Sequence, residues 1–200
     1  MTLRSFFNAK AATWDERVAE KDTGKLLAMS RRLDIRPGTC LLDVGTGTGV
    51  FLPYLLASVG NEGRIVALDL AEEMLKVARE KSYTGNIEYL CADVQAVPCG
   101  DGIFDGVVCY SSFPHFQDKT RALAEIFRVL KGGGGLFVCH TSPREEINHR
   151  HLSMPEVRHD LIPGEEEMRA LLRGAGFTAV NIEDGAESYL ATARKPAPDS

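Results

Sequence analysis

The residues from Asp43 to Gly49 carry the strongest chemical signal in the chain, with the pattern D-x-G-x-G-x-G directly after an apolar run. Glycines at alternate positions let the backbone turn sharply and bring a ligand against main-chain N–H groups. Nicotinamide dehydrogenases have G-x-G-x-x-G instead, which would need a glycine where this chain has Val50. The acid before the loop suits an ammonium group and repels a pyrophosphate. The loop therefore predicts a ligand without a diphosphate.

A second acid, Asp69, follows the next apolar run, twenty residues beyond Gly49. An acid at this place can accept hydrogen bonds from both hydroxyls of a ribose. The glycine loop and Asp69 together predict a ligand with a ribose and a positive charge. Asp69 and the later Asp93 could instead be turn formers or helix caps. Because both acids follow one glycine loop at the required spacing, ligand binding is favoured.

Alternating apolar and amphipathic runs predict the elements that position these residues. We expect strands at Cys40–Val44, Arg64–Leu68, Ile87–Cys91, Gly106–Tyr110, Leu136–His140, Thr178–Glu183 and Tyr189–Arg194. We expect helices between them at Phe51–Ser58, Glu72–Lys81, Lys119–Leu130 and Gly164–Ala175. This alternation predicts an α/β fold with a doubly wound, seven-stranded, mostly parallel sheet and helices on both faces. The first five strands are near-continuous apolar runs, as expected for covered strands, and the last two predict an antiparallel hairpin at the edge.

Five segments, in the same order and spacing, resemble motifs of the class I S-adenosylmethionine-dependent methyltransferases: Asp43–Gly49, Ala67–Leu75, Cys91–Val94, Phe104–Tyr110 and Glu125–Gly134. The resemblance covers about residues 35–140 and is nearest to the ubiquinone and menaquinone biosynthesis methyltransferases. It implies a Rossmann-like fold, methyltransferase activity and S-adenosyl-L-methionine as the cofactor. Gly133 departs from the pattern, because relatives more often have a proline before paired glycines. We interpret it as a looser turn without functional consequence.

The resemblance also implies a cofactor contact for each of Asp43, Gly45, Thr46, Gly47, Gly49, Asp69, Leu70, Met74, Asp93, Val94, Cys109 and Tyr110. The loop would line the methionine and ribose parts, with its first acid holding the loop or the ammonium group. Asp69 would bind the ribose hydroxyls, and the apolar residues that follow it would pack near the adenine. Asp93 and the Val94 amide would meet adenine nitrogens. Main-chain carbonyls at Cys109 and Tyr110 would accept hydrogen bonds from the ammonium group.

Residues just after the fourth and fifth strands are expected to carry the chemistry, because open α/β sheets bind ligands beyond the carboxyl ends of their strands. Methyl transfer from a sulfonium is an in-line displacement that needs alignment, and a base where the acceptor atom carries a proton. His115 and His140 follow these strands and are candidate bases. His115 could equally be a helix-capping or packed histidine between Phe113 and Phe116.

Four of the five histidines lie between positions 140 and 159, with Glu145, Glu146, Asn148 and Asp160 among or next to them. Imidazole with carboxylate suits a divalent metal, so His140 and His151 are candidate metal ligands, with acceptor recognition or no role as alternatives. A helix from near Pro143 would place His149 and His151 on different faces. Because Ile147 lies one turn before it, His151 is expected to face the cleft and is a third candidate catalytic residue.

Residues 1–35 are expected to be helical, with an apolar set at Leu26, Leu27, Met29 and Leu33. The side chains of Phe6, Phe7 and Trp14 are more apolar than a solvated extension requires. We expect them to form a lid over the cofactor, with docking on the sheet as the alternative. The whole chain, 1–200, is expected to be one methyltransferase domain. It comprises the lid (1–35), a cofactor-binding core (36–140), and an acceptor-side insertion, helix and C-terminal hairpin (141–195).

The composition of the 200 residues, 44% hydrophobic and 26% charged, is typical of one globular domain. The net charge of −5 has the wrong sign for a protein that binds phosphate backbones over a wide face. No run approaches the ~18 apolar residues of a membrane span, and the N-terminus lacks a signal-peptide apolar region. We therefore expect a cytoplasmic protein. The five cysteines contain no C-x-x-C pair and are expected to be reduced.

The expected function is methylation of a small-molecule acceptor, without a nucleic-acid partner, by a monomer or homodimer. An RNA or protein methyltransferase and a catalytically silent S-adenosylmethionine-binding protein are the alternatives. Val50 and the acidic entrance to the loop disfavour a nicotinamide oxidoreductase. Carbon, oxygen, nitrogen and sulfur acceptors all stay open. Arsenic methylation is disfavoured, because too few cysteines follow the strand ends.

Overall fold

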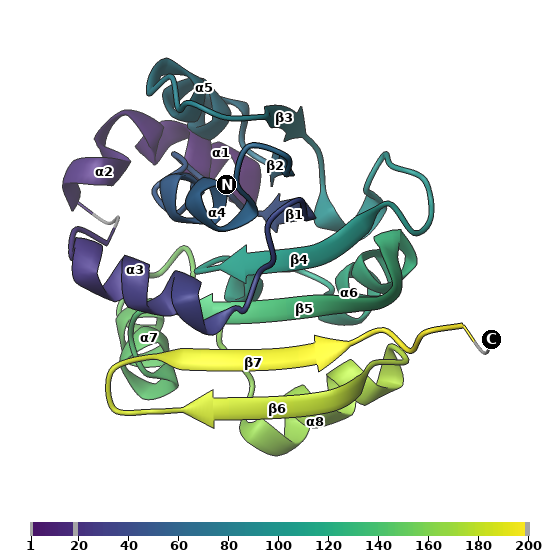
Figure 1. The fold of residues 1–200 in the computed structure, drawn as a ribbon. Helices are drawn as coiled ribbons and strands as arrows, with labels where there is room; N and C mark the ends of the chain where they lie inside the picture. The colour runs from purple at the N-terminus through teal and green to yellow at the C-terminus, as the bar shows by residue number, and fades with distance from the viewer. Residues whose placement is uncertain (1, 18–19, 199–200) are drawn as a thin grey trace.

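The computed structural model describes residues 2–17 and 20–198. In this part of the chain a seven-stranded sheet has the order β3-β2-β1-β4-β5-β7-β6 (Figure 1). The strands are β1 (Cys40–Val44), β2 (Arg64–Asp69), β3 (Ile87–Cys91), β4 (Phe104–Tyr110), β5 (Leu130–His140), β6 (Thr178–Asp184) and β7 (Tyr189–Arg194). Strands β1 to β5 are parallel, and β7 is antiparallel to β5 and to β6. The predicted Rossmann-like sheet with a C-terminal edge hairpin is confirmed.

Helices alternate with these strands, as the amphipathic runs predict. They are α1 (Leu3–Lys10), α2 (Trp14–Arg17), α3 (Thr23–Arg32), α4 (Leu52–Val59), α5 (Glu72–Glu80), α6 (Lys119–Val129), α7 (Arg144–Leu152) and α8 (Glu165–Gly174). Single turns η1 (Ala11–Thr13), η2 (Val94–Ala96) and η3 (Phe113–His115) complete the list. Helix α6 illustrates why these segments are helical. The Asp118 side chain caps its start by accepting a hydrogen bond from the Arg121 amide at 2.9 Å, and its apolar face is buried.

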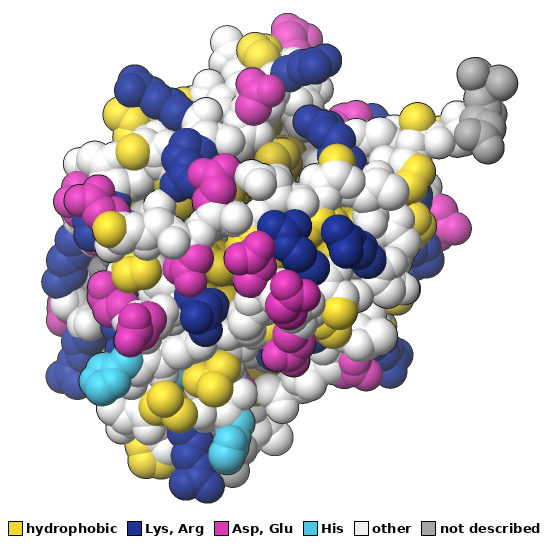
Figure 2. All heavy atoms as spheres, turned by 90° about the horizontal axis from the view of Figure 1, so that it is seen from below, with side chains coloured by type: hydrophobic (Ala, Val, Ile, Leu, Met, Phe, Trp, Pro, Cys, Tyr) yellow, Lys and Arg dark blue, Asp and Glu magenta, His cyan; other side chains and the backbone are white. Residues whose placement is uncertain are grey.

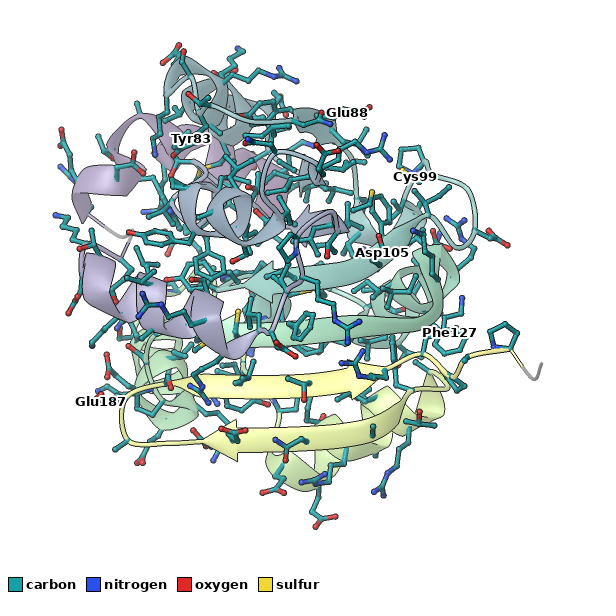
Figure 3. The ribbon with its side chains drawn as sticks, in the orientation of Figure 1. Tyr83, Glu88, Cys99, Asp105, Phe127 and Glu187 are labelled. Atoms are coloured by element: carbon teal, nitrogen blue, oxygen red, sulfur yellow. The ribbon has the colours of Figure 1, made fainter. Side chains whose placement is uncertain are left out.

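Side chains of the central strands alternate between two apolar layers. On β4, Val107 and Cys109 pack in the layer that holds the buried faces of α6 and α8. Val108 and Tyr110 point the other way, into the layer formed with α3 and α4. Because helices cover both faces of these strands, nearly every strand residue is apolar. The outer residues Glu88, on β3, and Glu187, in the turn between β6 and β7, lie at opposite edges of the sheet (Figure 3).

Two burial expectations were wrong. Strand β3 is not covered on both faces: Glu88 and Cys91 are exposed and the other residues are half-buried, because β3 is an edge strand. Leu27, expected in the apolar set of α3, is 40% exposed, whereas Leu26, Met29 and Leu33 are buried. A strand that reads as apolar can therefore still lie at an edge, since sequence does not reveal the strand order.

Strand β5 begins at Leu130 and not at Leu136 as predicted. Its first residues bulge around Gly133, whose φ is +80°, and exchange main-chain hydrogen bonds with Lys195 after β7. The Gly133 amide donates to the Lys195 carbonyl and the Lys195 amide donates to the Gly134 carbonyl, both at 2.9 Å. The polar glycine run thus joins the sheet through main-chain pairing, which apolar periodicity cannot detect.

Helix α1 and the turn η1 lie beside α5, whereas α3 packs against α4 (Figure 1). The Arg4 Nε donates to the Leu70 carbonyl at 3.0 Å, and the Asn8 side chain accepts from the Glu73 amide at 3.1 Å. Helix α1 therefore docks on α5 and not on the face of the sheet. Across the residues that the structure describes, no helix has the length and apolarity needed to span a membrane. Cytoplasmic location and oligomeric state stay predictions.

Candidate functional site

A cavity of about 280 Å³ lies at the carboxyl ends of the central strands, under the N-terminal helices. Nine of the predicted cofactor residues line it: Gly45, Thr46, Gly47, Asp69, Leu70, Met74, Asp93, Val94 and Tyr110. All three candidate catalytic residues line the same cavity: His115, His140 and His151. Open α/β sheets bind ligands at this edge. The cavity therefore brings the glycine loop and the histidines into one site.

The first two glycines of the loop have left-handed backbones, with φ of +70° at Gly45 and +56° at Gly47. A Cβ at Gly45 would lie 2.4 Å from the Cβ of Ser112, whereas a Cβ at Gly47 would meet nothing within 4 Å. Gly45 thus serves packing, and Gly47 leaves open space on the cavity side for a ligand. Gly49 does not line the cavity, because it packs against Leu52 and Tyr83.

Asp69 ends β2 and braces the glycine loop. Its Oδ2 accepts from the Gly47 amide and its Oδ1 from the Ala71 amide, both at 2.8 Å. Burial raises the pKa of Asp69, and these two hydrogen bonds oppose the rise. Each carboxylate oxygen retains a second lone pair. Asp69 can therefore hold the loop and still accept hydrogen bonds from two hydroxyls, as a ribose-bearing ligand requires.

Two other predicted cofactor residues lie outside the cavity. Asp43 is 2% exposed behind the loop, and burial, with added repulsion from Asp69, raises its pKa to about 7. Cys109 is fully buried in the layer beside α6. Neither side chain reaches the cavity, so a direct contact of Asp43 with an ammonium group is disfavoured. Thr46 does line it, and its buried side chain interacts with the Asp43 carboxyl and opposes the rise of that pKa.

Asp93 caps a turn and also lines the cavity. Its Oδ1 accepts from the Gln95 amide at 2.9 Å, so it caps the turn η2. The Gln95 side-chain amide also contacts both carboxylate oxygens at 3.1 Å. Asp93 nevertheless lines the cavity together with Val94, Leu70 and Met74. Asp93 can therefore cap the turn and still face a ligand in the cavity.

The three histidines reach one side of the cavity from three different elements. His115 ends the turn η3, His140 ends β5 and His151 lies in the last turn of α7. The ring centroids of His115 and His151 are 5.0 Å apart. His115 Nδ1 lies 2.8 Å from the Oδ2 of Asp160, and His151 Nδ1 contacts the main-chain oxygen of the same residue. Ile147 is buried and His149 exposed, so the helix turns His151 inward as predicted.

His140 differs from the other two in its protonation. It is 3% exposed, and its Nε2 has no hydrogen-bond partner among the described residues. Burial lowers its pKa to about 3, and repulsion from His115 and His151 adds to the shift. A base works best with a pKa near the operating pH. His140 is therefore suited to hydrogen bonding with a ligand and poorly suited to proton transfer.

The predicted metal site does not form. Within residues 2–17 and 20–198, no three or more histidine, cysteine, aspartate or glutamate side chains gather as metal ligands. The Nδ1 atoms of His115 and His151 are engaged by Asp160. The described residues therefore do not fit a divalent metal.

Several contacts that hold the site could not be found from the sequence. The Lys119 Nζ donates to the Pro114 and Phe116 carbonyls, at 3.0 and 3.2 Å, and thus fixes the turn that carries His115. The ring of Phe7 lies edge-on to His115, with 5.1 Å between centroids. The sequence pointed to Asp160 only as a carboxylate near the histidines that could bind a metal. Its contact with His115 spans 45 positions, and no local pattern reports such a pairing.

The chain is similar to known methyltransferases in sequence. A family model described as "Methyltransferase domain" matches residues 42–138. The ubiquinone/menaquinone biosynthesis C-methyltransferase UbiE of Cronobacter sakazakii is 31% identical, over 74% of this chain and 69% of the relative. UbiE of a Marinomonas species is 36% identical, over 56% of this chain and 47% of the relative. The match thus spans about half the length of that second relative.

Solved structures share the fold. A chain in the complex that contains the Haloferax volcanii Trm112 methyltransferase activator is similar with a TM-score of 0.82 and 22% identity, over 98% of this chain and 100% of that chain. An S-adenosylmethionine-dependent methyltransferase from Aquifex aeolicus has a TM-score of 0.75 and 24% identity, over 96% of this chain and 98% of that chain. At these identities the likeness is one of architecture.

Proposed function

Because the chain belongs to the class I S-adenosylmethionine-dependent methyltransferases, near the ubiquinone/menaquinone group, we propose that it methylates a small apolar molecule bound beside His115. One observation carries this proposal. A single cavity runs from the glycine loop and Asp69 to His115, His140 and His151. Cofactor and acceptor could therefore meet without water between them.

The chain's own groups suggest how the cofactor is held. Asp69 would accept hydrogen bonds from the ribose hydroxyls with its remaining lone pairs. The missing side chain at Gly47 would let the methionine part pass close to the backbone. Leu70 and Met74 would pack against the adenine. The main-chain carbonyl of Tyr110 would accept from the ammonium group.

S-adenosylmethionine supplies, when bound, a methyl group on a positively charged sulfur, which keeps the electron pair of the broken C–S bond. His115 would take the proton of the acceptor atom as that atom bonds to the methyl carbon in line. The proton would then pass from the imidazolium to water. His140 would stay neutral and hold the acceptor by a hydrogen bond, because its pKa of about 3 lies far below neutral pH.

The proposed acceptor is small and largely apolar. The lining near the histidines includes the apolar side chains of Phe7, Phe116, Ile147, Met154 and Val157, and also the polar residues Gln117, Thr141, Ser142 and Arg150. The UbiE relatives are named C-methyltransferases, so carbon is a candidate acceptor atom here. The face shown in Figure 2 has interspersed acidic and basic side chains and no continuous basic area of the kind that RNA binding uses.

Calorimetry with S-adenosylmethionine tests the proposed cofactor. We expect binding in the micromolar range, weakened by about 1.5–3 kcal/mol in Asp69→Ala, since charge-assisted hydrogen bonds to the ribose are lost. Glu80→Ala, a change of an exposed carboxylate on α5, is the matched control and should bind like the wild type. Tight binding of NADH without any response to S-adenosylmethionine would contradict the assignment.

The N-terminal helices are proposed to act as a mobile lid over this cavity, which Phe6, Phe7 and Trp14 help to line. Hydrogen exchange of the amides in α1 should slow when S-adenosylhomocysteine is bound, because closure orders the helix. Amides of α8, which does not line the cavity, should keep their exchange rates. If α1 is equally protected with and without ligand, these residues belong to the static core.

A further inference from the structure

Asp160 contacts two of the three cavity histidines and has no role in the chemistry described above. It lies between α7 and α8, with its Oδ2 2.8 Å from His115 Nδ1 and its main-chain oxygen against His151 Nδ1. The side chains of His115 and Asp160 are 15% and 14% exposed. Their contact is therefore largely shielded from water. A charge-assisted hydrogen bond is stronger in such a shielded place than in water.

Both partners of this contact are held independently. Asn148 clamps the segment after Asp160: its Nδ2 donates to the Ile162 carbonyl at 3.0 Å, and its Oδ1 accepts from the Ile162 amide at 2.8 Å. Asn148 and His151 lie three residues apart, on one face of α7. On the other side, Lys119 fixes the turn that carries His115. The geometry between Asp160 and His115 is thus imposed from two directions.

The chemistry of these contacts determines where the protons lie. A carboxylate oxygen and a main-chain carbonyl can only accept hydrogen bonds, so Nδ1 must be the protonated nitrogen in His115 and in His151. In the neutral form of each ring, the free lone pair is then on Nε2. Neither Nε2 has a hydrogen-bond partner in the described part of the chain, and both rings line the cavity. This side of the cavity therefore accepts hydrogen bonds from a ligand.

We propose that Asp160 is the positioning residue for His115 and His151. This proposal rests on the proposed function. Asp160 fixes His115 in the Nδ1–H form, so that Nε2 receives the proton of the acceptor. It holds His151 in the same form through its main-chain oxygen. The pair selects an acceptor that presents a hydrogen-bond donor, as a hydroxyl, thiol or N–H does. A ligand with acceptor oxygens alone finds no partner on these two rings.

Proton–nitrogen correlation NMR of the full chain, with isotope-labelled histidine, tests the tautomer. His115→Gln assigns the signal, and the wild type is expected to show His115 protonated on Nδ1. In Asp160→Asn the Nδ1–H preference should weaken, because the negative charge that favours a proton on Nδ1 is removed. Four other titratable groups interact with this pair and are the same in the wild type and in Asp160→Asn: Asp69, His140, His151 and Lys119.

Glu145→Gln is the matched control, because it removes one negative charge from an exposed site on α7 without touching His115. It should leave the His115 signals unchanged. If His115 of the wild type is protonated on Nε2, the proposal is wrong. This result does not depend on whether Asp160→Asn folds. Identical His115 signals in Asp160→Asn and wild type also overturn the proposal. S-adenosylmethionine affinity, measured in parallel, reports on the proposed function separately and should be unchanged in Asp160→Asn.

The selection of donors is tested with phenol and its methyl ether, anisole, in the presence of S-adenosylhomocysteine. Phenol should shift the Nε2 signals of His115 and His151 and bind about tenfold more tightly than anisole, since only phenol donates a hydrogen bond. Equal effects of the two probes, or no effect of phenol on either ring, would contradict the selection.

Discussion

Replacing His115 with glutamine is expected to lower the rate of methyl transfer by about 10²- to 10⁴-fold, the usual contribution of a positioned base. Glutamine keeps a polar side chain of similar length but cannot take a proton. The affinity for S-adenosylmethionine should be unchanged, because Asp69 and the glycine loop stay in place. The measurement is release of S-adenosylhomocysteine with a panel of phenols, enols and thiols, using the best acceptor found with the wild type.

His149→Gln is the control for this prediction. His149 lies on the exposed side of α7, two residues from His151, and contributes nothing to the cavity. Its replacement should leave the rate at the wild-type value. A His115→Gln variant with the full rate and normal cofactor affinity would show that the acceptor needs no base, or that another group supplies it.

Alanine at Gly45 and at Gly47 should have different effects, although both glycines belong to one loop. At Gly45 the added Cβ would lie 2.4 Å from the Ser112 Cβ, on a backbone with φ of +70°. Overpacking of about 1–3 kcal/mol and left-handed strain of about 1–2 kcal/mol should together lower the free energy of unfolding. At Gly47 only the strain applies, because the Cβ meets no protein atom within 4 Å. The Gly47→Ala methyl group should instead weaken S-adenosylmethionine binding, by about tenfold or more.

Gly38→Ala provides the control for strain alone. Gly38 has a φ of +80°, and a Cβ there would meet nothing within 4 Å. It does not line the cavity. Denaturant unfolding should therefore rank Gly45→Ala as the least stable, with Gly38→Ala and Gly47→Ala similar to each other. Calorimetry should find the cofactor affinity reduced in Gly47→Ala and normal in Gly38→Ala. Normal binding by Gly47→Ala would mean that the cofactor does not pass this glycine.

Element types and most bounds could be predicted because they depend on local pattern. Strand β1 and strand β7 begin and end at the predicted residues, and helix α6 differs by one residue at its end. Apolar runs buried on both faces and amphipathic periodicity need no distant partner to be recognised. The bulged start of β5 and the edge position of β3 escaped prediction, since each depends on which strand pairs with which.

The chain's sequence by itself determined the fold class and pointed to most of the residues that line the glycine-loop side of the cavity. The D-x-G-x-G-x-G loop, Asp69 and Asp93 each lie at or just after the end of a strand, and parallel strands bring their carboxyl ends to one edge. Tertiary structure alone decided the histidine side. The contacts of Asp160 with His115 and of Phe7 with His115 join residues distant in sequence, and burial sets the low pKa of His140. Hydrogen-bond partners and desolvation depend on how remote segments pack, and residue spacing along the chain does not encode that packing.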